Sequence, residues 1–67
     1  MNYKFTLILI GLNQSMTDIN ADFKDMKIFA SNMAEAESNA TVFAKTYGMR
    51  VCVLCQDLTE GERSQAA

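Results

Sequence analysis

The chain has 67 residues, of which 49% are hydrophobic and 21% charged, which is typical of one small globular domain. Its net charge of −2 argues against a general nucleic-acid binder, because there is no basic surface to replace the counterions of a phosphate backbone. It contains no histidine, the commonest catalytic base and zinc ligand. We therefore expect a protein that is not an enzyme, needs no cofactor or metal, and does not bind DNA or RNA directly.

Residues 3–12 are rich in β-branched and aromatic side chains and predict a β-strand. The alternation of a strand places four of these residues on the face that should meet the core: Tyr3, Phe5, Leu7 and Leu9. The apolar run also imitates a signal peptide, but it is too short to span a bilayer and no small-residue cleavage site follows it. We expect no membrane association.

The segment 11–22 is rich in Asn, Gln, Ser and Asp, a composition typical of a connection. Three interpretations stay open. The segment could be a plain connecting loop. It could contain a short helical turn opened by Ser15 and Asp18, because apolar residues recur at helical spacing: Leu12, Met16, Ile19 and Phe23. It could also lengthen the next strand, because Ile19, Ala21 and Phe23 alternate. We favour an extended β-hairpin arm, because structureless loops of this length are uncommon in compact domains.

Residues 23–30 predict a second strand and residues 32–47 a helix. Ser31 is the expected N-cap, since its hydroxyl can accept a hydrogen bond from an early backbone N–H. Lys45 lies in the last turn, where the helix dipole favours positive charge, and Gly48 follows as the residue free to adopt the left-handed conformation. Helical spacing predicts an apolar stripe that lies on the sheet: Met33, Ala36, Ala40, Phe43 and Tyr47.

Residues 49–56 predict the third strand, which contains the C-x-x-C motif of Cys52 and Cys55. On a strand, residues three apart point to opposite faces, so these thiols cannot share one metal or form a relaxed disulfide. A zinc site would also need two further ligands that the sequence does not supply. We interpret the two cysteines as small apolar residues of a strand.

The order β-β-α-β predicts one α+β domain over residues 1–57, followed by a disordered tail over residues 58–67. A hairpin followed by a right-handed crossover makes the first strand central and antiparallel to both neighbours, in the order 2-1-3. One helix then covers one face of a three-stranded antiparallel sheet. The opposite face is expected to expose an apolar patch, for which we predict a protein-binding or dimer interface: Ile8, Ile10, Phe29, Cys52 and Leu54.

Acidic residues gather before the second strand, at Asp18, Asp22 and Asp25, and again in the tail. A solvated surface accounts for them. A sharper interpretation is a negative patch that meets a basic groove in the way nucleic acid would.

Residues 23–54 resemble a pattern found in small phage and prophage accessory proteins, including some anti-CRISPR proteins. In that pattern a strand ending in Ala-Ser, here Ala30 and Ser31, leads into a helix with spaced alanines, here Ala36 and Ala40. Gly48 and a closing strand follow. Such proteins act by occupying a surface of a host complex, but they share no common site, so the resemblance implies no functional residue.

These observations favour a small non-enzymatic protein-binding protein, and the resemblance implies a phage-encoded inhibitor of a host defence or nucleic-acid-processing complex. A structural or regulatory homodimer, associating through the open sheet face, is the alternative. The two cysteines without a disulfide framework fit a reducing compartment, so we expect the protein in the cytoplasm, which is the host's if a phage encodes it.

Overall fold

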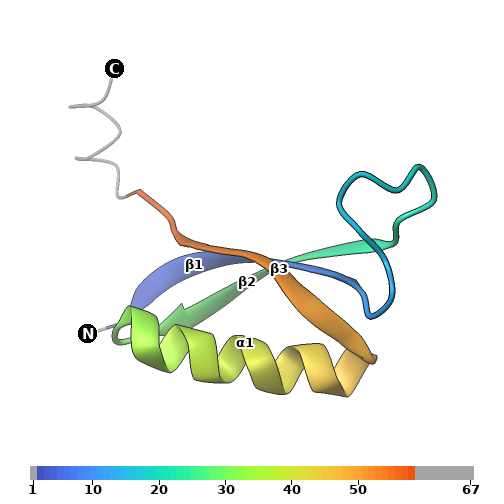
Figure 1. Ribbon diagram of the computed structural model, residues 1–67. Coiled ribbons are helices and arrows are strands. Elements are labelled where there is room, and N and C mark those ends of the chain that lie inside the picture. The colour runs from blue at the N-terminus through green and yellow to red at the C-terminus, as the bar shows by residue number, and fades with distance from the viewer. Residues whose placement is uncertain (1, 59–67) are drawn as a thin grey trace.

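The computed structural model describes residues 2–58 and confirms the predicted ββαβ fold. Strands β1 (Tyr3–Gly11) and β2 (Phe23–Ala30) precede helix α1 (Met33–Tyr47), and strand β3 (Met49–Gln56) follows it. The sheet has the order β2-β1-β3, with β1 antiparallel to both neighbours, and the helix covers one face (Figure 1). The predicted tail, residues 58–67, falls outside the described residues except for Leu58.

The two pairs of strands differ in regularity. β1 and β2 pair without interruption from Tyr3 opposite Ala30 to Ile10 opposite Phe23. Between β1 and β3 the register shifts, because Ile8 lies opposite Val53 whereas Leu9 lies opposite Val51. Cys52 is therefore an extra residue on β3, which is the arrangement of a β-bulge.

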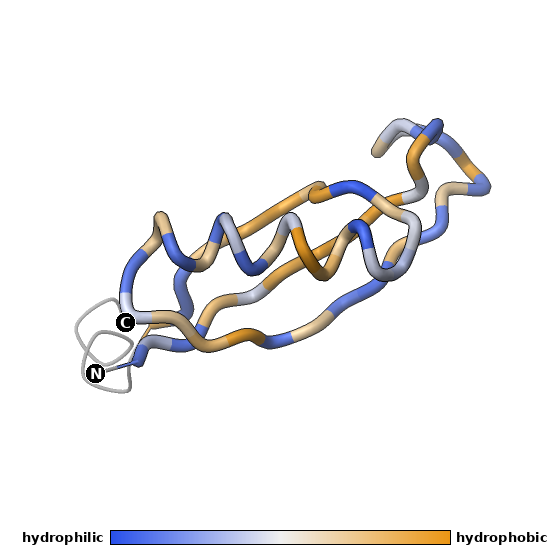
Figure 2. Tube along the Cα trace, turned by 90° about the horizontal axis from the view of Figure 1, so that it is seen from below, coloured by the Kyte–Doolittle hydropathy of each residue, from blue (hydrophilic) through white to orange (hydrophobic). Residues whose placement is uncertain are grey.

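The core lies between the sheet and the helix. Phe5, Leu7 and Leu9 of β1 are fully buried there, as predicted, while Tyr3 remains exposed. Ile28 and Ala30 complete the buried part of the sheet. Figure 2 views the molecule from the helix side and shows apolar strand segments running behind α1. The remaining hydrophobic residues that pack against this core are half-buried: Met26, Met49, Val51 and Leu54.

The buried stripe of α1 consists of alanines rather than of the larger residues that were predicted with them. Ala36, Ala40 and Ala44 are buried, whereas Phe43 and Tyr47 are 37% and 47% exposed. Met33 is likewise exposed. Residues four apart lie on one side of a helix, and side chains of a single methyl group let the helix approach the sheet closely. The large side chains consequently lie at the margins of the helix–sheet contact.

Asn32, and not Ser31, caps the helix. The Asn32 side-chain oxygen accepts a hydrogen bond from the Glu35 backbone N–H at 2.8 Å. Ser31 lies one residue too early for this role, and its hydroxyl instead donates to the Glu35 carboxylate. At the other end, Gly48 adopts φ 66°, the left-handed conformation that was predicted for it.

Replacing Asn32 with alanine should lower the free energy of unfolding by about 0.5–2 kcal/mol, because one early N–H of the helix loses its acceptor. Urea denaturation followed by circular dichroism measures the change. Ser31→Ala is the matched control and should cost less, since its partner is a side chain at the surface. A larger effect at Ser31 than at Asn32 would contradict this assignment of the cap.

The connection between β1 and β2, residues 12–22, is a chain of hydrogen-bonded turns, which we call the connecting arm. The Gly11 N–H donates to the Asp22 carbonyl oxygen and closes its base. Ser15 and Asp18 form a turn, which was one of the interpretations left open for this segment: the Ser15 N–H donates to the Asp18 carboxylate and the Asp18 N–H to the Ser15 carbonyl. β2 nevertheless begins only at Phe23, so the strand-like alternation before it does not lengthen the sheet.

Candidate functional site

The open face, defined as the sheet face opposite the helix, is not the continuous apolar patch that the sequence predicted. Phe29 is exposed there and Ile8 is half-buried. Leu54, however, lies opposite Leu7 and packs against the helix-side core. The bulge at Cys52 reverses the alternation of β3 between Val51 and Val53, so Val53 and not Leu54 lies beside Ile8.

Ile10 was also predicted to be exposed, but it is fully buried and does not belong to the helix-side core. Its neighbour across β3, Arg50, donates from its guanidinium to the Gln14 carbonyl oxygen of the connecting arm. Gln14 in turn accepts from the Asp22 N–H and donates to the Asn20 carbonyl. The connecting arm rises on the side of the sheet away from the helix (Figure 1), and we conclude that it covers Ile10.

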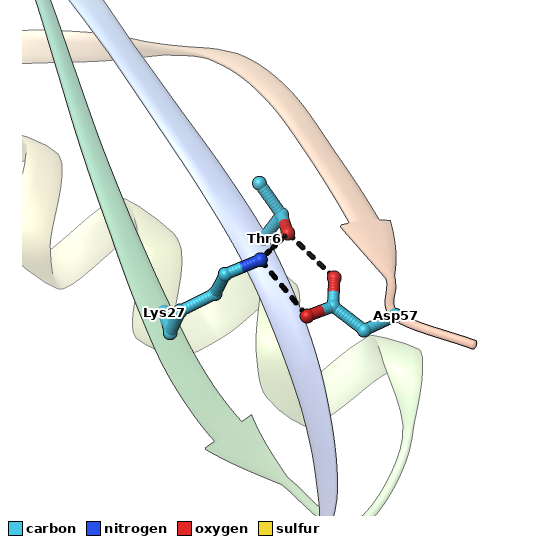
Figure 3. A network of polar contacts seen from close by, with 3 residues as sticks. All are labelled: Thr6, Lys27 and Asp57. Carbon is cyan, nitrogen blue, oxygen red and sulfur yellow. Dashed lines mark hydrogen bonds and ion pairs between the residues drawn. The ribbon is translucent and has the colours of Figure 1, made fainter. Parts of the chain in front are cut away.

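A polar network occupies the other half of the open face. Thr6, Lys27 and Asp57 form what we call the Asp57 clamp (Figure 3). The Thr6 hydroxyl donates to one oxygen of Asp57, and the Lys27 ammonium donates to the other at 2.9 Å and to the Thr6 hydroxyl. The Asp57 N–H donates to the Lys4 carbonyl and extends the β1–β3 ladder by one pair. The clamp ties the end of β3 to the two other strands.

The hydrogen bonds from Thr6 and then from Lys27 lower the pKa of Asp57 below its ordinary value of 3.8. A lowered pKa in the folded state means that the clamp stabilises the fold at pH values above 3.8 and that this contribution is lost as the pH falls through the folded pKa. We expect Asp57→Asn to lower the melting temperature at pH 7, and the difference from the wild type to shrink at pH 3. Asp22→Asn, at an exposed aspartate, is the control. An unchanged difference at the two pH values would show that ionisation of Asp57 does not stabilise the fold.

Exposed apolar side chains gather on the connecting arm. Ile19 is 100% exposed and Met16 is 63% exposed, and Leu12 at the base is also largely exposed. The hydrogen bonds around Gln14, Ser15 and Asp18 connect residues within this segment and order it. Sequence reasoning missed the arm as a candidate site. The apolar residues at positions 12, 16 and 19, in a segment that is otherwise polar, were the available signal.

The three aspartates predicted as an acidic surface are exposed, but they differ in their contacts. Asp18 accepts the turn hydrogen bond from Ser15, which gives its carboxylate a structural role. Asp22 lies at the end of the connecting arm, and Asp25 lies on β2 opposite Ile8. A binding role for these carboxylates stays a prediction.

Both cysteines are free and lie in β3, where Cys55 is exposed and Cys52 is half-buried at the bulge. Among residues 2–58, no three potential ligands of the His, Cys, Asp or Glu type converge on a position that could hold a metal ion. None of the described helices has the length and hydropathy needed to cross a membrane.

Exposed apolar side chains therefore lie on the connecting arm, on β2 as Phe23 and Phe29, and on the outer part of α1 as Val42. No protein-family model matches this chain, and no curated protein and no solved structure is significantly similar to it.

Proposed function

We propose that this chain is a non-enzymatic protein-binding protein that inserts the apolar tip of its connecting arm into an apolar pocket of another protein. The observation that carries the proposal is the complete exposure of Ile19 on a segment ordered by hydrogen bonds. A fully hydrated isoleucine gains free energy only when a partner removes it from water. Because the arm is already ordered, binding would cost little further conformational entropy.

The chemistry of the arm indicates the kind of pocket that would receive it. Met16 and Ile19 are flexible and branched aliphatic side chains, and Met adapts to irregular apolar surfaces. Asp18 lies between them in the sequence and Asp22 follows, so a pocket with a basic rim would complement the arm. The resemblance of residues 23–54 to phage and prophage accessory proteins makes a host defence or nucleic-acid-processing complex the class of partner to test first.

Ile19→Asp tests the proposal, because it removes the apolar side chain without touching a packed residue. Immobilised wild-type protein should retain a bacterial partner that Ile19→Asp does not retain, and the purified partner should bind the variant at least about tenfold more weakly, which corresponds to about 1.4 kcal/mol. Asn13→Asp adds the same charge on the same arm and should bind like the wild type. Equal binding by Ile19→Asp and the wild type would show that the arm is not the binding surface.

A structural or regulatory homodimer is the second candidate function. The observation that favours it is the exposure of two large aromatic side chains on one edge strand, Phe23 at 52% and Phe29 at 60%.

A further inference from the structure

We propose that two copies of this chain join edge to edge through β2, so that two β2 strands pair antiparallel about a twofold axis at Met26. This inference rests on the second candidate function, the homodimer, and is independent of the connecting arm. It uses the edge of the sheet and not its open face. Its basis is the order of four residues along β2, namely Phe23, Asp25, Lys27 and Phe29.

These four residues present their backbone groups outward. In an antiparallel ladder, successive residues of a strand point their N–H and C=O groups alternately toward and away from the neighbouring strand. The Gly11 N–H donates to the Asp22 carbonyl, so residue 22 faces β1 and every second residue after it does the same. The residues between them therefore offer unpaired N–H and C=O groups at the free edge: Phe23, Asp25, Lys27 and Phe29.

The side chains of this edge are complementary to themselves. Outward residues of one copy must lie opposite outward residues of the other. With the axis at Met26, Phe23 lies opposite Phe29 of the second copy, and Asp25 lies opposite Lys27 of the second copy. Each pair occurs twice, so the joined strands form two aromatic pairs and two ion pairs on the open face, and cross-strand pairs of both kinds are stabilising.

Neighbouring registers of the two β2 strands do not pair opposite charges in this way. An axis at Asp25 would place that carboxylate opposite its own copy, and an axis at Lys27 would do the same with two ammonium groups. Like charges directly opposite each other are destabilising. The sequence of β2 thus selects the register about Met26.

The contacts within one copy leave this edge accessible. The Lys24 ammonium lies over the Tyr47 ring at 4.6 Å, so it is directed toward the helix. Lys27 gives two of its three N–H donors to the Asp57 clamp, and its side chain is 50% exposed, which leaves one donor for an incoming carboxylate. β3, the other edge, is interrupted by the bulge at Cys52, and bulges discourage edge pairing.

On the helix side of the joined sheet, the dimer would also bury apolar side chains. A twofold axis between antiparallel strands is perpendicular to the sheet, so both helices lie on the same face. An open groove between β2 and α1 is lined by Ile28, Asn39, Val42 and Phe43. Val42 and Phe43 are exposed in one copy, and the grooves of the two copies would adjoin beneath the paired strands.

Light scattering after size exclusion, over a range of concentrations, tests the proposal. The wild type should reach twice the chain mass of 7.5 kDa. Asp25→Lys replaces two ion pairs with two like-charge pairs and should raise the dissociation constant of the dimer by more than about tenfold. The circular dichroism spectrum should not change, because Asp25 is exposed.

Mixing two charge variants makes the test specific to this register. Asp25→Lys and Lys27→Asp should each be monomeric alone and should form a mixed dimer together, since each then presents the opposite charges to the other. If Lys27→Asp fails to fold, a Met26→Cys variant with Cys52→Ser and Cys55→Ser replaces it. Position 26 would lie opposite itself at about 4.5 Å between Cα atoms, within the range of a disulfide. Oxidation should link that variant into dimers, and Lys24→Cys in the same background should stay unlinked.

A wild type that is monomeric at every concentration would overturn the proposal. So would a dimer that Asp25→Lys leaves intact, or one that Ile19→Asp dissociates, because either result would place the contact elsewhere. Retention of a bacterial partner by Asp25→Lys would leave the function proposed for the connecting arm standing, whatever the outcome for the dimer.

Discussion

Leu7→Ala is expected to lower the free energy of unfolding by about 2–5 kcal/mol, the range for deleting a large aliphatic side chain from a packed core. Leu7 is fully buried on the central strand, opposite Met26 on one side and Leu54 on the other. A core of this size rarely supplies more than about 3–5 kcal/mol of net stability, so the variant should be largely unfolded at room temperature. Urea denaturation monitored by circular dichroism measures the difference.

Leu12→Ala is the matched control for this change. Leu12 follows the same strand but is 60% exposed, and substitutions at such positions usually change stability by no more than about 0.5 kcal/mol. Similar losses at the two leucines would mean that Leu12 is also packed, and they would contradict the placement of the core between the sheet and the helix.

Ala40→Leu is expected to cost about 1–3 kcal/mol, because the added carbon atoms overpack the contact between the helix and the sheet. Ala40 is 1% exposed and lies in the middle of the alanine stripe that packs on the sheet. The larger side chain must either push the helix away from β1 and β3 or take a strained rotamer. Thermal denaturation of the variant should show the loss as a lower melting temperature.

Ala34→Leu provides the comparison on the same helix. Ala34 is exposed, and leucine and alanine differ little in helix propensity, so this variant should melt close to the wild type. If Ala40→Leu melts like Ala34→Leu, the helix does not contact the sheet through its alanines.

The predicted and observed candidate sites differ because one inserted residue changes which side chains share a face. Alternation along residues 49–56 placed Leu54 with Ile8, and the same alternation holds on each side of the bulge. The extra residue at Cys52 shifts the two halves of β3 relative to each other, so that Val51 and Leu54 both face the helix. No local feature of the sequence marks that position, since Val, Cys and Leu are all compatible with either face.

In the Asp57 clamp, by contrast, the sequence predicted the face on which two of the residues lie but not that they contact Asp57. Alternation already placed Thr6 and Lys27 on the open face, but only the registers of two strand pairs bring both beside Asp57. Polar pairing at a distance of 51 residues along the chain depends on the registers of the sheet, and those depend on the packed core.

The sequence by itself determined the order of the elements, their bounds to within one residue and the sheet order β2-β1-β3, because these follow from local properties and from the handedness of one connection. Strand alternation, the left-handed Gly48 and the preference for right-handed crossovers act within a few residues or within one connection. Only the tertiary structure decided that Ile10 is covered by the connecting arm, that Leu54 belongs to the core and that Ile19 is left in water. These outcomes depend on how the connecting arm folds back over the sheet and on where the register between β1 and β3 shifts. Contacts between residues distant in the chain determine both.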